Sequence, residues 1–438
     1  MTQDSTKRPL YVGLAGLGTV GGGLVQLLKK DAEMIRRRSG REIVLRKVLV
    51  RRLTPERAAQ LPQGCTLTAN PADLTEDPEI DVIVELIGGT GLAKSLISRA
   101  LEMGKHVVTA NKALLAEDSK ELFKLAREKN CLMRYEGSVA GAIPIVETLG
   151  GPLAGNRILS LHGILNGTSN YVLSEMTTNN LDFATALSQA QEKGYAEADP
   201  TLDIDGFDAA HKLILLIRLA FGLDYPFTSM PIKGIRGMDS RDIVMAREFG
   251  YRIKLVAIAK LHEQEDGPAR MEAGVFPMLV HHSLLLARVG GVYNAVRLEG
   301  EASGPLFLHG RGAGALPTAS VVLSDLLSIA REDRPNNTGF ADDEILPTAI
   351  VPPEDWSSSF YVRVMVHDEP GVLRDIAGCM ADEGISMAQV IQKEKEDNEV
   401  QLVFMTHEAS ALNMKKALQS VADKGLLQKE PVCYRILQ

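Results

Sequence analysis

The sequence predicts an α/β protein, in which a doubly wound parallel sheet is followed by an α+β domain and by a ferredoxin-like domain. From the N-terminus, short apolar runs alternate with helical patterns, which is typical of a parallel sheet with helices on both faces. Near the C-terminus, the order strand, helix, strand, strand, helix, strand is that of a ferredoxin-like unit. The length of 438 residues exceeds what one hydrophobic core holds, so more than one domain is expected.

The first domain is expected to contain at least four strands, which are near-continuous apolar runs rich in β-branched residues. They cover residues 10–15, 43–50, 81–87 and 105–110. Between and after these strands we expect helices, one running to about residue 38 and two more over residues 92–103 and 113–129.

The alternation of short strands and helices changes between about residue 146 and residue 310, where longer helical segments occur among separated strand candidates. The expected helices cover residues 183–193, 207–221 and 240–251, and the expected strands cover residues 158–165 and 252–260. This mixture predicts a second domain of α+β type.

Residues 333–359 are rich in Pro, Asn, Asp and Ser and lack any periodicity, so they are predicted to be a linker. Residues 360–438 then form the ferredoxin-like domain. Its expected strands are 360–367, 386–393, 399–406 and 432–437, and its expected helices are 372–383 and 409–423.

Composition excludes several classes of function. A net charge of −8 argues against nucleic-acid and anionic-membrane partners, because both require a basic face. No uncharged apolar run reaches the roughly 18–20 residues of a membrane span. The four cysteines lack zinc-ligand spacing and are expected to be reduced thiols of a cytoplasmic protein.

A glycine-rich loop follows the first expected strand and opens a helix. Its residues are Gly16, Leu17, Gly18, Thr19, Val20 and Gly21. In a Rossmann-type domain the first glycine makes the turn, the second lets the backbone approach a pyrophosphate, and the third lets helix and strand pack closely. The helix N-terminus donates N–H groups to the phosphates. A tight turn without a ligand is the alternative, but the strand–loop–helix context favours dinucleotide binding.

The end of the second expected strand bears on the choice of cofactor. Enzymes that use NAD usually carry Asp or Glu there, and those that use NADP carry Arg. Here the strand continues into Arg51 and Arg52 without a carboxylate. A solvated basic strand end is the alternative, but a clamp for the 2′-phosphate is favoured, and with it NADP over NAD.

Three carboxylates, Glu197, Asp203 and Asp208, precede Lys212 in a polar loop and a mostly apolar helix. Asp208 and Lys212 are four residues apart, so they share one helix face. An isolated surface ion pair would contribute little. An acidic cluster with one lysine suits a zwitterionic substrate, because a carboxylate pairs with the substrate ammonium group while the protonated lysine donates to a forming alkoxide.

A second lysine, Lys112, follows the strand 105–110. Open α/β sheets bind ligands at the carboxyl ends of their strands. Lys112 is therefore expected near the nicotinamide or the substrate carboxylate, with a surface lysine at a helix N-terminus as the alternative.

Taken together, these motifs resemble those of the homoserine dehydrogenase family. Over about residues 12–326 they follow the family's order: the loop Gly16–Gly21, Gly88-Gly-Thr90, Thr109-Ala-Asn-Lys112, Asn166-Gly-Thr-Ser-Asn170, Gly194-x-Ala-Glu197, Asp203…Asp208-x-x-x-Lys212, Gly310-Arg-Gly312-Ala-Gly314 and Pro317-Thr-Ala-Ser320. The tail segment Asp368-Glu-Pro370-Gly371-Val372-Leu373 is similar to the opening loop of ACT domains. Because the chain begins at the dinucleotide fold, a monofunctional member without a fused aspartokinase is expected.

The resemblance implies the reversible reduction of L-aspartate 4-semialdehyde to L-homoserine, on the route to threonine and methionine. It implies that Lys212 is the proton donor, with Lys112 as the second active-site lysine. Substrate-binding roles are implied for Glu197, Asp203, Asp208 and Thr168. Beyond the glycine-rich loop and the two arginines, contacts to the cofactor are implied for Thr90, Lys112, Gly194, Gly312 and Gly314.

The resemblance also implies a sodium ion, held by Glu136 with backbone carbonyls at Val139, Gly141 and Ile143. It implies that residues 1–146 and 311–332 together form the dinucleotide-binding domain, and that residues 147–310 form the substrate, catalytic and dimerisation domain. A homodimer or homotetramer is expected.

For the ACT domain the resemblance implies an amino-acid effector, with threonine as the expected one. The effector loop would be formed by Asp368, Pro370, Gly371, Val372 and Leu373. Some family members carry an insensitive ACT domain, so the motif predicts a fold rather than a response.

Two rival interpretations remain open from the residues alone. One is a dehydrogenase for another amino or hydroxy acid on the same scaffold. The other is an amino-acid sensor that binds the cofactor without catalysis, against which the presence of Lys112, Glu197, Asp208 and Lys212 argues.

Overall fold

The computed structural model describes residues 7–264, 267–332, 339–340, 345–394 and 399–437. The chain forms two compact units. Unit 1 comprises residues 1–159, 210–229 and 293–347, and unit 2 comprises residues 160–209, 230–292 and 348–438.

Unit 1 is built on a parallel sheet of six strands in the order β3-β2-β1-β4-β5-β6. The strands are β1 (Leu10–Ala15), β2 (Ile43–Leu49), β3 (Thr66–Thr68), β4 (Val82–Glu85), β5 (His106–Thr109) and β6 (Met133–Arg134). The chain builds outward in both directions from β1, which pairs with β2 on one side and β4 on the other. Such a switch point is where doubly wound sheets bind their ligands.

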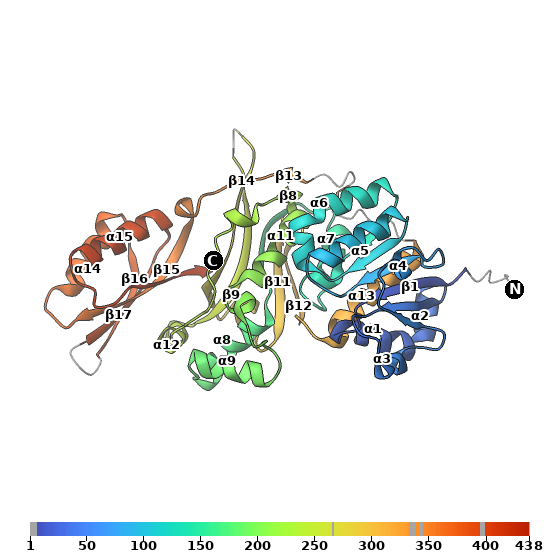
Figure 1. The fold of residues 1–438 in the computed structure, drawn as a ribbon. Coiled ribbons are helices and arrows are strands. Elements are labelled where there is room, and N and C mark those ends of the chain that lie inside the picture. Colours follow the sequence, from blue (N-terminus) through green and yellow to red (C-terminus); the bar gives the residue numbers. More distant parts are fainter. Residues whose placement is uncertain (1–6, 265–266, 333–338, 341–344, 395–398, 438) are drawn as a thin grey trace. The chain divides into compact units, whose positions relative to one another are not determined.

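Helices cover both faces of this sheet (Figure 1). On one face, α1 (Thr19–Lys30), α2 (Ala32–Ser39) and α13 (Ala315–Arg331) share a core with the side chains of alternate strand residues. On the other face lie α4 (Ala72–Thr75), α5 (Gly91–Glu102) and α6 (Lys112–Glu128). Helix α13 comes late in the chain, yet it packs into the same hydrophobic core as the N-terminal strands and helices.

The rest of unit 1 consists of shorter elements and one hairpin. They are α3 (Pro55–Gln60), η1 (Glu136–Ser138), α7 (Ile145–Gly150), η2 (Phe227–Ser229), the hairpin of β11 (Tyr293–Gly300) and β12 (Gly304–Arg311), and the pair of β8 (Leu223–Asp224) and β13 (Leu346–Pro347). Helix α11 (Phe207–Phe221) starts in the residues of unit 2 and continues in those of unit 1.

Unit 2 contains a sheet in which strands follow in the order β7-β9-β10-β19-β15-β17-β16. They are β7 (Ile158–Ile164), β9 (Tyr251–His262), β10 (Arg270–His281), β15 (Ser357–His367), β16 (Met387–Glu394), β17 (Glu399–Thr406) and β19 (Val432–Leu437). Two short strands extend it: β14 (Ala349–Ile350) pairs with β10, and β18 (Ala409–Ser410) pairs with β15.

The helices of unit 2 pack against this sheet or against one another. They are α8 (Gly167–Asn179), α9 (Phe183–Glu192), α10 (Thr201–Ile204), α12 (Ser240–Glu248), η3 (Leu285–Arg288), η4 (Pro353–Asp355), α14 (Val372–Asp382) and α15 (Ala411–Asp423).

The C-terminal part of unit 2 has the β-α-β-β-α-β order that the sequence predicts. Alternate residues of β15, from Phe360 to Val366, form a core with Ile376 and Met380 of α14 and with Met414 and Val421 of α15. The last strand, β19, pairs antiparallel with β15 and parallel with β10. The ferredoxin-like domain therefore continues the sheet of β10, β9 and β7.

The predicted fold class is confirmed, with local differences. The first helical pattern is broken at Asp31, which caps α1 and starts α2. The helix predicted over residues 240–251 ends at Glu248, because Gly250 adopts a positive φ and Tyr251 begins β9. Helix α8 and the strands β10, β11 and β12 were not expected.

The predicted linker is more ordered than its composition suggested. Residues 333–338 and 341–344 lie outside the described residues, but residues 345–359 include β13, β14, η4 and the start of β15. Trp356 is buried, and its indole N–H donates to Val351 O at 2.9 Å. The predicted domain boundaries stay a prediction. In the described part of the chain, no helix is long and apolar enough for a membrane span.

Candidate functional site

The glycine-rich loop joins β1 to α1 at the switch point of the six-stranded sheet. Gly16 has a φ of +102°, and a Cβ there would lie 2.6 Å from Leu86 O. A Cβ on Gly21 would lie 2.0 Å from Gly16 O, so helix and loop are in direct backbone contact. At Gly18, by contrast, no atom lies within 4 Å of a Cβ position. The chain leaves that space open, as backbone approach of a pyrophosphate requires.

A buried carboxylate organises the loops beside this site. Glu85, the last residue of β4, accepts hydrogen bonds from Ile87 N at 2.8 Å and Gly88 N at 3.0 Å, and from Thr109 Oγ1 at 2.6 Å. It thereby joins the carboxyl ends of β4 and β5. Sequence reasoning assigned Glu85 no role, although a carboxylate that ends an apolar strand was a usable signal.

The turns that carry Thr90 and Lys112 are tied together by Asn111. Its Nδ2 donates to Gly89 O at 2.7 Å, and its Oδ1 caps α6 by accepting from Leu114 N at 3.2 Å. Thr90 is the N-cap residue of α5 and Lys112 is the first residue of α6. Both therefore lie at helix N-termini at the carboxyl edge of the sheet.

Arg51 and Arg52 follow β2 and are exposed. Among the described residues neither side chain forms an ion pair, and a third arginine, Arg57, donates to Arg52 O at 2.8 Å. A basic strand end without a carboxylate fits a phosphorylated ribose better than a free 2′-hydroxyl.

Gly312 and Gly314 lie between β12 and α13. A Cβ on Gly312 would lie 2.2 Å from Asn294 Oδ1, and one on Gly141 would lie 2.4 Å from Gly312 C. Gly314 has a φ of +129° and precedes α13 directly. Close packing and backbone conformation thus account for glycine at these positions.

In unit 2, the structure brings together Asp203 and Asp208 through Asn166. The Asn166 Nδ2 donates to Asp203 Oδ1 at 2.6 Å and to Asp208 Oδ2 at 2.8 Å. Its Oδ1 accepts from Ser169 N at 2.7 Å and so caps α8. Because the cap fixes the amide orientation, both amide hydrogens face carboxylates. Sequence reasoning gave Asn166 no role, although Asn before a helix is a capping signal.

The loop before α10 carries Glu197, predicted to bind substrate, and Gly194, predicted to contact the cofactor, and it is tied to Thr168 of α8. Thr168 is buried, and its Oγ1 donates to Tyr195 O at 2.7 Å, which ties α8 to this loop. Gly194 has a φ of +71°. Glu197 is exposed, and its carboxylate has no hydrogen bond or ion pair within the described residues. The predicted acidic cluster is thus a pair of carboxylates joined by Asn166, the buried Asp208 and the half-buried Asp203, with Glu197 on the exposed loop.

Helix α11 carries Asp208 in its first turn and Lys212 one turn later. The side chains of Asp208 and Lys212 are only 6% and 8% exposed. This burial separates them from an ordinary surface ion pair, and low local polarity strengthens the interactions of both charges with a bound substrate.

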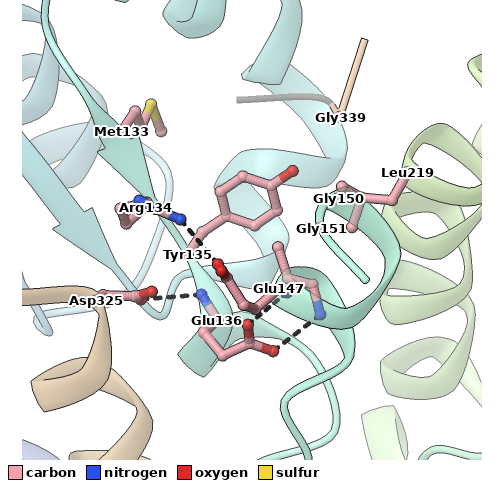
Figure 2. A pocket seen from close by; sticks show the side chains of 11 residues that line it. Met133, Arg134, Tyr135, Glu136, Glu147, Gly150, Gly151, Leu219, Asp325 and Gly339 are labelled. Carbon is pink, nitrogen blue, oxygen red and sulfur yellow. Dashed lines mark hydrogen bonds and ion pairs between the residues drawn. The ribbon is translucent and has the colours of Figure 1, made fainter. Parts of the chain in front are cut away.

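The segment predicted to hold sodium contains η1 and a tight turn. Figure 2 shows that the Glu136 carboxylate points to the start of α7, where it accepts from Val146 N at 2.9 Å and Glu147 N at 2.7 Å. Asp325 accepts from Glu136 N at 3.0 Å. Burial raises the pKa of Glu136 to about 7, against the two backbone hydrogen bonds, which lower it. The carboxylate therefore serves as a helix cap.

The backbone carbonyl oxygens of the same turn fit a cation better than the Glu136 carboxylate does. Val139 and Ile143 are buried, and Ala140 and Gly141 have positive φ. Among the described residues, no backbone hydrogen bond reaches the carbonyl oxygens of Val139 and Gly141. Buried unpaired carbonyls are suitable ligands for a hard cation. No described group of three or more His, Cys, Asp or Glu side chains has metal-site geometry.

The ACT-like segment lines a cavity of about 480 Å³ at the end of β15. Of the predicted effector residues, Asp368, Gly371, Val372 and Leu373 line it, and Pro370 lies in the same turn. Gly371 has a φ of +99° and begins α14. The opening loop and the first turn of α14 thus form one wall of a space large enough for an amino acid.

Comparisons with known proteins cover nearly all of the chain. Residues 16–136 match the family model for the homoserine dehydrogenase NAD-binding domain, residues 144–327 the model for homoserine dehydrogenase, and residues 360–423 the ACT domain model. The homoserine dehydrogenase of Neisseria gonorrhoeae is 43% identical over 96% of this chain and 97% of its own. That of Pseudomonas aeruginosa is 42% identical over 91% and 92%.

Solved structures give the same result. The crystal structure of a homoserine dehydrogenase from Thiobacillus denitrificans superimposes with a TM-score of 0.91 at 41% identity, over 98% of this chain and 99% of that one. The homoserine dehydrogenase of S. aureus follows with a TM-score of 0.75 at 30% identity and the same coverage.

Proposed function

The chain belongs to the homoserine dehydrogenase family, and from this premise we propose which of its residues carry out the reaction. Its activity is that of an NAD(P)-dependent oxidoreductase acting on a CH–OH group, which interconverts L-aspartate 4-semialdehyde and L-homoserine in threonine and methionine biosynthesis. The pair Asp203 and Asp208, held by Asn166, is the observation that carries the assignment of residues.

The acidic residues bind the amino-acid end of the substrate. Asp208, which is buried and accepts a hydrogen bond from Asn166, pairs with the substrate ammonium group. Asp203, which accepts from the same amide, adds a second negative charge beside it. Glu197, on the exposed loop, approaches the substrate from the solvent side. Thr168 keeps this loop in place through Tyr195 O.

The two lysines act on the oxygen that changes charge. The nicotinamide, when bound, supplies the hydride for the aldehyde carbon. Lys212 stabilises the negative charge that grows on the carbonyl oxygen and gives its proton to that oxygen. Lys112, at the N-terminus of α6, adds a second positive charge for the substrate.

NADP is the cofactor we propose. The pyrophosphate lies on the loop from Gly16 to Gly21 and on the N-terminus of α1, where the chain leaves space at Gly18. Arg51 and Arg52 bind the 2′-phosphate. Thr90, Gly194, Gly312 and Gly314 border the bound cofactor.

A sodium ion and an effector complete the proposal. The ion is held by Glu136 with the backbone carbonyls of Val139, Gly141 and Ile143. In support of this, the carbonyls of Val139 and Gly141 accept no backbone hydrogen bond among the described residues. Threonine occupies the cavity lined by Asp368 and Gly371 and inhibits the enzyme. We further propose a homodimer or homotetramer in the cytoplasm.

One assay tests the proposed function. Oxidation of NADPH is followed with aspartate semialdehyde and with a panel of other carbonyl acids, and NADH is tested in parallel. The proposal predicts turnover restricted to aspartate semialdehyde, with a lower KM for NADPH than for NADH. Arg51→Ala with Arg52→Ala should remove that cofactor preference. Equal turnover on other carbonyl acids would contradict the substrate assignment.

A further inference from the structure

A second polar cavity, of about 350 Å³, lies in unit 2 among residues for which the proposed reaction has no use. It is bounded by the C-terminal half of α8, the start of β9 and the segment that follows β10. Its charged lining consists of Arg252, Lys254 and Arg288, with His282 beside them, and no carboxylate lines it. Neither the residues proposed for substrate and cofactor nor those for the effector take part.

Within the described part of the chain, Lys254 is a buried cation without a counter-ion. Its side chain is 5% exposed, and its Nζ donates to Val289 O at 2.6 Å and to Asn170 Oδ1 at 3.1 Å. Both acceptors are neutral. Burial, together with repulsion from Arg252, lowers the pKa of Lys254 to about 8. An ammonium group has three donors, so one remains for a ligand in the cavity.

The two arginines also keep most of their donors unused. Arg252 donates to Tyr251 O at 3.3 Å, and Arg288 has no hydrogen bond or ion pair within the described residues. Neighbouring acids are engaged elsewhere. Glu175 of α8 accepts from Asn179 at 2.6 Å, and Glu248 of α12 is paired with Lys393 at 2.5 Å.

The edge of the cavity is open to solvent and adds further donors. Arg288, His282 and Thr178 are exposed. The His282 ring is positioned by a hydrogen bond between Nδ1 and Gly250 O at 2.7 Å.

We propose that this cavity binds a phosphate group, either as inorganic phosphate or on a small phosphate ester. Three basic side chains surround one space, so a dianion compensates their charge better than a single carboxylate does. The planar guanidinium groups of Arg252 and Arg288 match the geometry of phosphate oxygens. A phosphate oxygen also accepts the remaining hydrogen of Lys254. The volume leaves room for a small organic group beside the phosphate.

Binding of inorganic phosphate to the full chain tests the proposal, measured by calorimetry at constant ionic strength. NADPH is kept saturating, so that the proposed 2′-phosphate site is filled. We expect one phosphate per chain, bound about tenfold or more weakly in Arg252→Ala and in Arg288→Ala, since each loses a charged hydrogen bond. Arg288→Lys should restore part of the affinity.

The controls separate the site from general charge effects. Arg37→Ala removes an exposed arginine from α2 in unit 1 and should leave the affinity unchanged. Glycerol 3-phosphate is then tested in place of phosphate. Tighter binding than that of phosphate would identify an ester as the ligand, and weaker binding would identify the free ion. Equal affinity in the wild type and both arginine variants would overturn the proposal, as would the absence of binding with correctly folded protein. Because this experiment measures phosphate binding and not turnover, its result does not depend on the result of the dehydrogenase assay.

Discussion

The amide group of Asn166 holds two carboxylates in one place. Its oxygen is tied to the N-terminus of α8, so its two hydrogens are directed to Asp203 and Asp208. Asparagine is neutral and leaves both negative charges available to an ammonium group. A lysine at this position would cancel one of them, and an alanine would remove the hydrogen-bond donor that the two carboxylates share.

Asn166 is therefore predicted to position the substrate-binding acids. Asn166→Ala should raise the KM for aspartate semialdehyde about 10- to 100-fold, because two hydrogen bonds to charged groups are lost, while kcat and NADPH binding change less. Asn166→Asp adds a third carboxyl group and should shift the acid limb of kcat/KM to higher pH. Steady-state kinetics from pH 6 to 9 measure both effects. Asp182→Ala, which removes the exposed cap of α9, is the control for capping alone.

Lys212 is predicted to be the proton donor. Lys212→Ala should lower kcat by about 10²- to 10⁴-fold, the usual contribution of a positioned acid, with NADPH affinity retained. Stopped-flow reduction and fluorescence titration of NADPH check the two parts separately. Lys30→Ala, at the exposed end of α1, is the matched control. Turnover near that of the wild type would refute the assignment.

Lys254 should leave a signature in the pH dependence of stability. Its pKa is lowered from 10.5 to about 8, so between these values the unfolded chain holds a proton that the folded chain has lost. Stability relative to Lys254→Met should therefore rise with pH across this window, by about 3 kcal/mol in all. Urea unfolding in phosphate-free buffer measures it. A parallel pH dependence in both proteins would show that Lys254 does not titrate there.

At the scale of elements, α12 and β15 are joined by a buried ion pair. Arg363 of β15 donates to both carboxylate oxygens of Asp242, at 2.6 and 2.8 Å, and Asp242 is fully buried. Tyr361 adds a hydrogen bond to Asp242 at 2.9 Å. The contact links the ferredoxin-like domain to the helix that precedes β9.

The effect of this pair on stability depends on whether one partner or both are replaced. Arg363→Leu should destabilise the protein by about 3–5 kcal/mol, because the buried Asp242 loses its bidentate cation, although Tyr361 still donates to it. Adding Asp242→Leu should recover much of that loss, since a buried pair can often be replaced by apolar residues at little cost. Denaturant midpoints of the two single variants and the double variant test this. A double variant as unstable as the sum of the single ones would contradict it.

At the scale of the whole molecule, the ACT domain shares its sheet with the strands that precede it in unit 2. The last strand, β19, lies between β10 and β15, and the domain supplies the partner of Asp242. Removing residues from about 357 onward would expose the edge of β10 and leave a buried carboxylate unpaired. Regulation is therefore better tested by a point substitution than by truncation.

Asp368→Ala is the substitution that the effector cavity indicates. Asp368 lines the cavity of about 480 Å³ and is exposed, so its loss should not affect folding. We expect inhibition by threonine to weaken about tenfold or more, through the lost contact to the effector ammonium group, with kcat unchanged. Asp382→Ala, at the end of α14, is the control. Unchanged inhibition would place the effector elsewhere.

Local patterns in the sequence were enough to predict much of the fold. The alternation of apolar strands and helices identified the parallel sheet, and the helix over residues 207–221 agrees with α11 residue for residue. The glycine-rich loop followed from the requirement for positive φ at Gly16 and for close backbone contact at Gly21. These features depend on residues a few positions apart, which periodicity and backbone sterics report directly.

Only the tertiary structure revealed the groups that support the site. Asn166 meets Asp203 and Asp208 across 37 and 42 residues, and Glu85 meets Thr109 across 24. The same holds for the insertion of β19 between β10 and β15 and for the cations around Lys254. Such contacts arise when separate elements pack, and no pattern along the chain specifies which side chains then meet. The sequence thus determined the elements and the family's chemistry, and packing decided which polar groups hold that chemistry in place.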